Sequence, residues 1–206
     1  MQKKEKINKI INGIGLLLIL GSALLSFSFI YNKYRDKQET EKIIDEVFEN
    51  KNTPTLEVED GETPTTTESP KKQEIQLTNS YLGYIELSDY GIKRLITNRT
   101  DKATLDKGLV GLMNISTNLD DENGNIIMAG HSTSNVFQKL HYMKIGAQIK
   151  ITTHQKTYYY QITEKHTIND NDYSYFKNVE DKKLLTLITC KNNSKQRLIV
   201  IAELRG

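Results

Sequence analysis

The sequence predicts an all-β domain that follows a membrane-spanning helix. From about residue 73 onward, short apolar or alternating segments recur, separated by Gly, Asn and Asp. An uncharged apolar run fills residues 10–31, and all three prolines fall in the polar stretch between that run and the strands. Regularly spaced short strands are typical of a β-barrel or β-sandwich. At 206 residues, the chain has room for one such domain and its accessories.

The apolar run at 10–31 is long enough for one transmembrane helix, which needs roughly 20 residues. Four lysines precede it, whereas residues 33–41 mix basic and acidic side chains. This bias favours an N-terminus in the cytoplasm. A cleaved secretory signal is the alternative, but its apolar region is usually shorter and no clear small-x-small cleavage site is present. We expect a cytoplasmic tail at 1–9 and a single-pass signal-anchor in the cell membrane, with the rest of the chain outside.

Residues 32–72 are predicted to be a helical and disordered spacer. Ile43, Ile44, Val47 and Phe48 recur at helical spacing, which predicts either a short amphipathic helix over 36–50 or a frayed stalk. Residues 51–72 combine the prolines with many threonines and acids, a composition that cannot bury enough apolar surface to fold.

The formal net charge of +2 hides three unlike segments. Residues 1–35 carry a net charge of +5, residues 36–72 carry −6, and residues 73–206 carry +3. The basic residues of the last segment are scattered and form no stripe, which argues against a surface for nucleic acid.

Residues 73–206 are predicted to form the folded domain. Its expected strands are residues 81–86, 92–96, 125–129, 147–152, 156–166, 183–190 and 197–204. One helix is expected near 135–142, where apolar residues share one face, and a short helical turn is expected within 102–113.

Cys190, the only cysteine, ends the predicted strand 183–190, so no intramolecular disulfide can form. Arg197 opens the next strand after a turn-rich segment, and an antiparallel hairpin would put both residues at its mouth. His131 follows the strand 125–129. A thiol at one strand end, with an imidazole and a guanidinium at others, suggests a nucleophile, a base and a charge stabiliser. The alternative is a buried, inert cysteine in a tethered binding module with no chemistry.

These segments resemble the sortases, the cysteine transpeptidases of Gram-positive surfaces. The matching segments are Thr-Leu-Ile-Thr-Cys at 186–190, Ala-Gly-His at 129–131, Phe-x-x-Leu at 137–140 and Arg-Leu-Ile-Val at 197–200. The resemblance covers roughly residues 78–206, and the tail, span and spacer also follow the family's usual order. A papain-like hydrolase is excluded, since that family places its cysteine early and its histidine late.

The resemblance implies an eight-stranded sortase-type β-barrel with one or two short helices, whose missing strand we expect within 108–118. It implies that Cys190 is the nucleophile, His131 the general acid/base and Arg197 the stabiliser of substrate or oxyanion. Thr189 and Ile188, just before the cysteine, are expected to contact the substrate.

The implied reaction is cleavage of an LPxTG-like sorting signal between Thr and Gly, through a thioester on Cys190. The expected partners are surface proteins with a C-terminal sorting signal and an amine of the cell-wall peptidoglycan precursor. A pilin-polymerising sortase, with a pilin lysine as acceptor, is the alternative. The chain has no Asp-Pro-aromatic lid motif before the domain, which weighs against that alternative.

No cofactor or metal is expected. Acidic side chains cluster at 120–122 and 170–172, and such loops hold calcium in some class A sortases. Calcium is therefore the alternative, although it prefers several converging oxygens and loop acids are usually just solvated. His141, His154 and His166 have no metal-type spacing, and we interpret them as structural or exposed.

Overall fold

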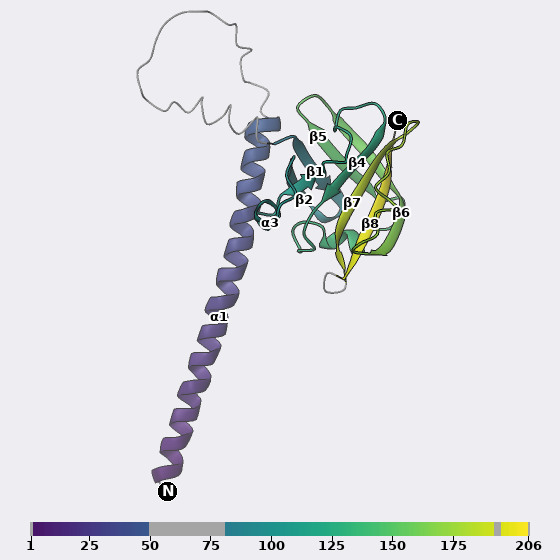
Figure 1. Ribbon diagram of the computed structural model, residues 1–206. Helices are drawn as coiled ribbons and strands as arrows, with labels where there is room; N and C mark the ends of the chain where they lie inside the picture. Colours follow the sequence, from purple (N-terminus) through teal and green to yellow (C-terminus); the bar gives the residue numbers. More distant parts are fainter. Residues whose placement is uncertain (1, 50–80, 192–194, 206) are drawn as a thin grey trace, which may run out of the picture. The chain divides into compact units, whose positions relative to one another are not determined.

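The computed structural model describes residues 2–49, 81–191 and 195–205 (Figure 1). The chain divides into two units, Met1–Lys42 and Ile43–Gly206. The spacer predicted at 51–72 lies outside the described residues.

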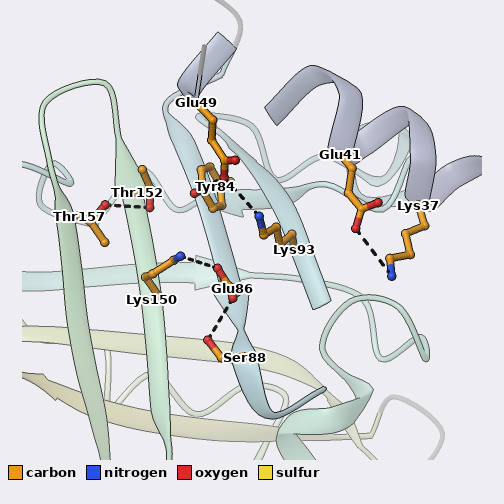
Figure 2. Close-up of polar contacts among 10 residues, drawn as sticks. All are labelled: Lys37, Glu41, Glu49, Tyr84, Glu86, Ser88, Lys93, Lys150, Thr152 and Thr157. Atoms are coloured by element: carbon orange, nitrogen blue, oxygen red, sulfur yellow. Dashed lines mark hydrogen bonds and ion pairs between the residues drawn. The ribbon is translucent and has the colours of Figure 1, made fainter. Parts of the chain in front are cut away.

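The first unit is helical. Helix α1 covers Gln2–Ile44, and its last two residues, together with the π-helical turn at Asp45–Glu49, belong to the second unit. Among the described residues, this is the one helix long and apolar enough to cross a membrane, with a mean hydropathy of 2.2 in its most apolar window and none of that window buried. The helix does not end at residue 31, because neither Gly nor Pro interrupts residues 32–49. Lys37 and Glu41 form an i,i+4 ion pair there at 3.7 Å (Figure 2).

The second unit contains a closed barrel of eight strands, as the family resemblance implies (Figure 1). The strands are β1 Gly83–Leu87, β2 Ile92–Thr97, β3 Val110–Leu112, β4 Gly124–Ala129, β5 Gln148–Thr153, β6 Thr157–Asn169, β7 Lys183–Lys191 and β8 Gln196–Leu204. Around the barrel their order is β1-β2-β3-β4-β7-β8-β6-β5. The expected eighth strand is β3, which has only three residues.

The helical elements of the barrel are shorter than the sequence predicts. The 3-10 helix η3 covers Gln138–His141, inside the expected helix 135–142. Helix α3 covers Lys102–Asp106, and the rest of the expected turn 102–113 leads into β3. A second 3-10 helix, η2, covers Ser88–Tyr90 between β1 and β2.

The main core fills the barrel interior with side chains that alternate along the strands. Leu185 and Leu187 of β7 point inward, as do Leu198 and Val200 of β8, and all four are less than 5% exposed. Side chains alternate between the two faces of a strand, so the residues between them point outward.

The outer faces of the barrel differ in chemistry. On the β1 side, Glu86 pairs with Lys150 at 2.7 Å, and Glu49 pairs with Lys93 at 3.2 Å (Figure 2). On the β4, β7 and β8 side, a second apolar cluster lies on the outside. Its members are Ile127, Ile168, Ile188 and Ile199, with Met113, Tyr175, Phe176 and Ile201 packed against them.

The buried amide of Asn125 holds the segment 175–178 on this apolar outer face. Its Nδ2 donates to the carbonyl of Lys177 at 3.0 Å, and its Oδ1 accepts from the Thr186 hydroxyl at 2.8 Å. The Asn125 main-chain N–H donates to the Asn178 side chain at 3.3 Å. The segment between β6 and β7 is therefore fixed to the barrel by hydrogen bonds of the buried Asn125. Loss of a hydrogen-bond partner costs a buried polar group free energy of folding.

Asn125→Ala removes these side-chain bonds and leaves the buried Thr186 hydroxyl unpaired. We expect it to lower the free energy of unfolding by about 2 kcal/mol, the cost of buried polar groups without partners. Urea denaturation of the full chain measures this. Asn123→Ala, at an exposed position nearby, is the matched control. A loss no greater than in the control would contradict this role for Asn125.

Candidate active site

Strand pairing brings the three predicted catalytic residues to one end of the barrel. Cys190 and Arg197 are direct partners across β7 and β8. Strands β4 and β7 run parallel with Ala129 opposite Ile188, so two residues further the chains reach His131 and Cys190. The Gly130 N–H donates to the Ile188 carbonyl at 3.1 Å and continues this pairing beyond β4.

The same register places Cys190 and Arg197 on one face. Ile127, Ile188 and Ile199 belong to the outer apolar cluster. Because side chains alternate, Cys190 and Arg197 share the outer face with Ile188 and Ile199. The Cys190 side chain is a free thiol that is partly exposed, and its residue is not sealed in the core. The alternative of a buried, inert cysteine is therefore not favoured.

The backbone around His131 is held by contacts with the barrel. The Thr189 hydroxyl donates to the Gly130 carbonyl at 2.8 Å, and the Phe137 N–H donates to the His131 carbonyl at 3.0 Å. A Cβ on Gly130 would lie 2.7 Å from the Phe137 ring, so only glycine allows this approach. Arg94, only 4% exposed, donates from Nε to the Asn135 carbonyl at 2.6 Å. The loop after β4 is thus fastened at several points.

The two predicted substrate-binding residues differ in their environment. Thr189 is 2% exposed, and its hydroxyl donates a hydrogen bond to the Gly130 carbonyl. Ile188 is 7% exposed and lies in the outer apolar cluster, beside the segment that Asn125 holds. Their contact with a substrate stays a prediction. The four isoleucines of the cluster are at most 7% exposed, and the partly buried Met113, Tyr175 and Phe176 pack against them.

His131 has a carboxylate partner that sequence reasoning missed. Its Nε2 lies 2.9 Å from Oδ1 of Asp106, the last residue of α3. Hydrogen bonds from Lys102 and then from His131 lower the pKa of the Asp106 carboxyl. Asp106 precedes His131 by 25 residues, and no motif or spacing connects the two before the barrel is assembled.

His141 is a second imidazole beside the predicted nucleophile. Its ring makes a hydrogen bond with the main chain of Cys190, and Nε2 lies 3.4 Å from the Ser132 hydroxyl. Burial lowers the pKa of His141 despite that main-chain bond. The structural role expected for His141 from sequence fits this place, where the ring links the His131 loop to the strand of Cys190.

The acidic loop at 120–122 is organised around a buried lysine. Lys183, 6% exposed, donates from Nζ to the carbonyls of Leu119 at 2.8 Å and Asp121 at 2.6 Å. Oδ1 of Asp120 accepts from the hydroxyls of Thr153 at 2.9 Å and Tyr158 at 2.8 Å. Within the described ranges, no group of three or more His, Cys, Asp and Glu side chains could hold a metal ion.

Comparison with known families gives one domain match. Residues 85–205 match the family model of the Sortase domain. Sortase A of Listeria monocytogenes serovar 1/2a is 28% identical over 200 residues, which cover 92% of this chain and 88% of that protein.

Solved structures give the same fold. The Sortase D5 transpeptidase of Clostridium perfringens aligns with a TM-score of 0.57 and 27% identity, over 67% of this chain and 89% of that one. The pilus-related Sortase C of Group B Streptococcus aligns with a TM-score of 0.59 and 20% identity, over 63% of this chain and 72% of that one. At that identity the second likeness shows the fold alone.

We expect Cys190 in the folded chain to react with iodoacetamide, because the thiol is partly exposed and its strand partner Arg197 carries a positive charge that favours the attacking thiolate. His131→Ala should slow the labelling, because it removes the predicted acid/base that can accept the thiol proton. Timed alkylation followed by intact-mass spectrometry measures the rate. His154→Ala, which removes a histidine on the turn between β5 and β6, is the control. Labelling that requires urea would contradict an accessible nucleophile.

Proposed function

The chain belongs to the sortase family, and from this premise we propose that it cleaves an LPxTG-like sorting signal between Thr and Gly and joins the new threonine carboxyl end to an amine. Members of the family are cysteine transpeptidases. The single observation that carries the assignment of residues is the strand register that pairs Cys190 with Arg197 and continues β4 to His131.

The first half-reaction makes a thioester. The Cys190 thiolate attacks the threonine carbonyl carbon, and the carbonyl oxygen becomes negative. The Arg197 guanidinium, across the strand pair, stabilises that oxygen or holds the peptide backbone with its planar fork of N–H donors. The C–N bond then breaks, and protonated His131 gives its proton to the departing glycine amine.

The second half-reaction releases the product. An incoming amine attacks the thioester carbonyl, and neutral His131 takes the proton that the amine loses. The C–S bond breaks and returns the Cys190 thiolate. Atoms and charge balance over the two halves, because one amide is exchanged for another and the proton given in the first half returns in the second.

The partly exposed residues that cover the outer apolar cluster are suited to an extended peptide. The pair Ile188 and Ile199 lies two residues further into the hairpin than the pair Cys190 and Arg197. Tyr175 and Phe176 of the β6–β7 segment pack onto the same cluster. We propose that the apolar residues of the signal lie against Tyr175 and Phe176, which are partly exposed, and place the Thr-Gly bond at the sulfur.

The proposed location is the outer side of the cell membrane. Helix α1 is a candidate membrane span by length and composition, and four lysines precede its apolar run. This charge distribution favours an N-terminus in the cytoplasm and a barrel outside. There the acceptor is proposed to be an amine of the peptidoglycan precursor. Mass spectrometry of the product distinguishes this acceptor from a pilin lysine.

Cys190→Ala is expected to abolish cleavage of an LPxTG-type peptide, because no other thiol exists in the chain. Arg197→Lys should lower kcat/KM by about tenfold or more, since a point charge replaces a bidentate fork. A quenched-fluorophore peptide assay reports both. Arg205→Lys, an exposed change at the far end of β8, is the matched control. If Cys190→Ala still cleaves, the assignment is wrong.

We propose that the reaction needs no metal ion. The Lys183 ammonium binds two carbonyls of the acidic loop, and Asp120 is engaged by two hydroxyls, so an internal cation and internal donors already satisfy this loop. We expect kcat/KM to change by less than about twofold between a chelator and added calcium, which would need several converging free oxygens. A strong gain of activity with calcium would contradict this.

A further inference from the structure

The contact between Asp106 and His131 has no role in the reaction as described so far. Oδ1 of Asp106 lies 2.9 Å from Nε2 of His131, and the two side chains are 47% and 34% exposed. Exposed ion pairs alone are weak and often incidental. The question is whether the fold builds this contact and whether the chemistry of the imidazole uses it.

The fold fixes Asp106 through the short helix that ends with it. Asp101 caps α3 by accepting from the Thr104 N–H at 3.1 Å and from the Thr104 hydroxyl at 2.8 Å. Gly108, with a positive φ of 75°, ends the turn and donates to the Leu105 carbonyl at 2.9 Å. A left-handed backbone of this kind favours glycine.

The strands on both sides of α3 fix where that helix lies. Strand β2 precedes it, and β3 follows it, with Ile96 opposite Val110. Strand β3 also pairs with β4, with Leu112 opposite Met128. Because β4 leads directly to His131, Asp106 and His131 are placed by neighbouring strands of the same barrel.

The two oxygens of the Asp106 carboxylate have separate partners. Lys102, one turn earlier in α3, bonds to Oδ2 at 2.5 Å, while Oδ1 faces His131. The hydrogen bonds from Lys102 and His131 lower the pKa of this carboxyl, so it is ionised at neutral pH. An ionised carboxylate only accepts hydrogen bonds. Nε2 of His131 must therefore be the donor.

A donor at Nε2 decides which nitrogen can act in the reaction. In the neutral ring only one nitrogen carries a proton, so Nδ1 then holds the free lone pair. A carboxylate that holds one imidazole nitrogen in this way fixes the tautomer and stabilises the imidazolium, as in the serine proteases.

We propose that Asp106 is a positioning residue for His131, which holds the imidazole by Nε2 so that Nδ1 exchanges protons with Cys190 and with the amines of substrate and acceptor. This inference rests on the proposed function, in which His131 is the general acid/base. Asp106 touches neither the sulfur nor the substrate in this account and acts only through the ring.

The test compares Asp106→Ala, the rescue variant Asp106→Glu and the control Lys102→Met in the full chain in detergent. Asp106→Ala should lower kcat for an LPxTG-type peptide by about tenfold or more and leave KM within about twofold, because proton transfer suffers and binding does not. Asp106→Glu should recover part of kcat. Lys102→Met keeps Oδ1 on His131 and should stay within about twofold of wild type.

Nitrogen-15 spectra of labelled histidine report the tautomer of His131, which would not change if Asp106 had only a structural role. The His131 signals, assigned by their loss in His131→Ala, should show the proton on Nε2 in wild type and in Lys102→Met. In Asp106→Ala they should show a mixture of tautomers. Unchanged thermal unfolding of Asp106→Ala would confirm that the fold is intact.

The outcomes separate this inference from the proposed function. If His131→Ala is inactive while Asp106→Ala keeps the wild-type kcat and tautomer, the positioning role is wrong and the function stands. If His131→Ala keeps the wild-type rate, both fail.

If Lys102→Met lowers kcat as much as Asp106→Ala does, the ion pair in α3 matters and the bond to His131 is not the cause. If Asp106→Ala fails to fold, the tautomer and rate of Asp106→Glu decide, and a wild-type tautomer with a lost rate would overturn the proposal.

Discussion

The register between β4, β7 and β8 is the constraint on which the candidate active site depends. The parallel β4–β7 pairing ends two residues before His131 and Cys190, and the antiparallel β7–β8 pairing sets Cys190 opposite Arg197. A slip of one residue would turn Cys190 into the barrel and put a core leucine outside. The fully buried Thr186 hydroxyl opposes that slip, because a shifted register would take it away from Asn125 and leave it without a partner.

Buried polar side chains around the site hold the backbone segments that carry its residues. Arg94 holds the loop after β4 by a carbonyl, Thr189 holds Gly130, and Asn125 holds the segment over the outer apolar cluster. The three side chains that make these bonds are 2–4% exposed, so breaking one leaves a desolvated group without a partner. The reacting side chains can remain partly exposed because the backbone beneath them is fixed by these buried contacts.

Much of this arrangement follows from local sequence, and the rest follows from contacts between distant residues. The long strands are predicted by alternation and turn residues, and Cys190 is found because it is the only thiol at a strand end. Strand β3 is too short to show a period. Asp106 and Lys183 acquire their roles only when the barrel joins β2, β3, β4 and β7, so no local pattern marks them.

Trapping the acyl intermediate tests the central claim most directly. The full chain is mixed with an LPxTG-type peptide without an acceptor amine, quenched in acid, digested and sequenced by mass spectrometry. The account predicts that Cys190 carries the peptide fragment that ends at Thr, bound as a hydroxylamine-sensitive thioester. No adduct on Cys190, together with cleavage of the same Thr-Gly bond, would contradict it.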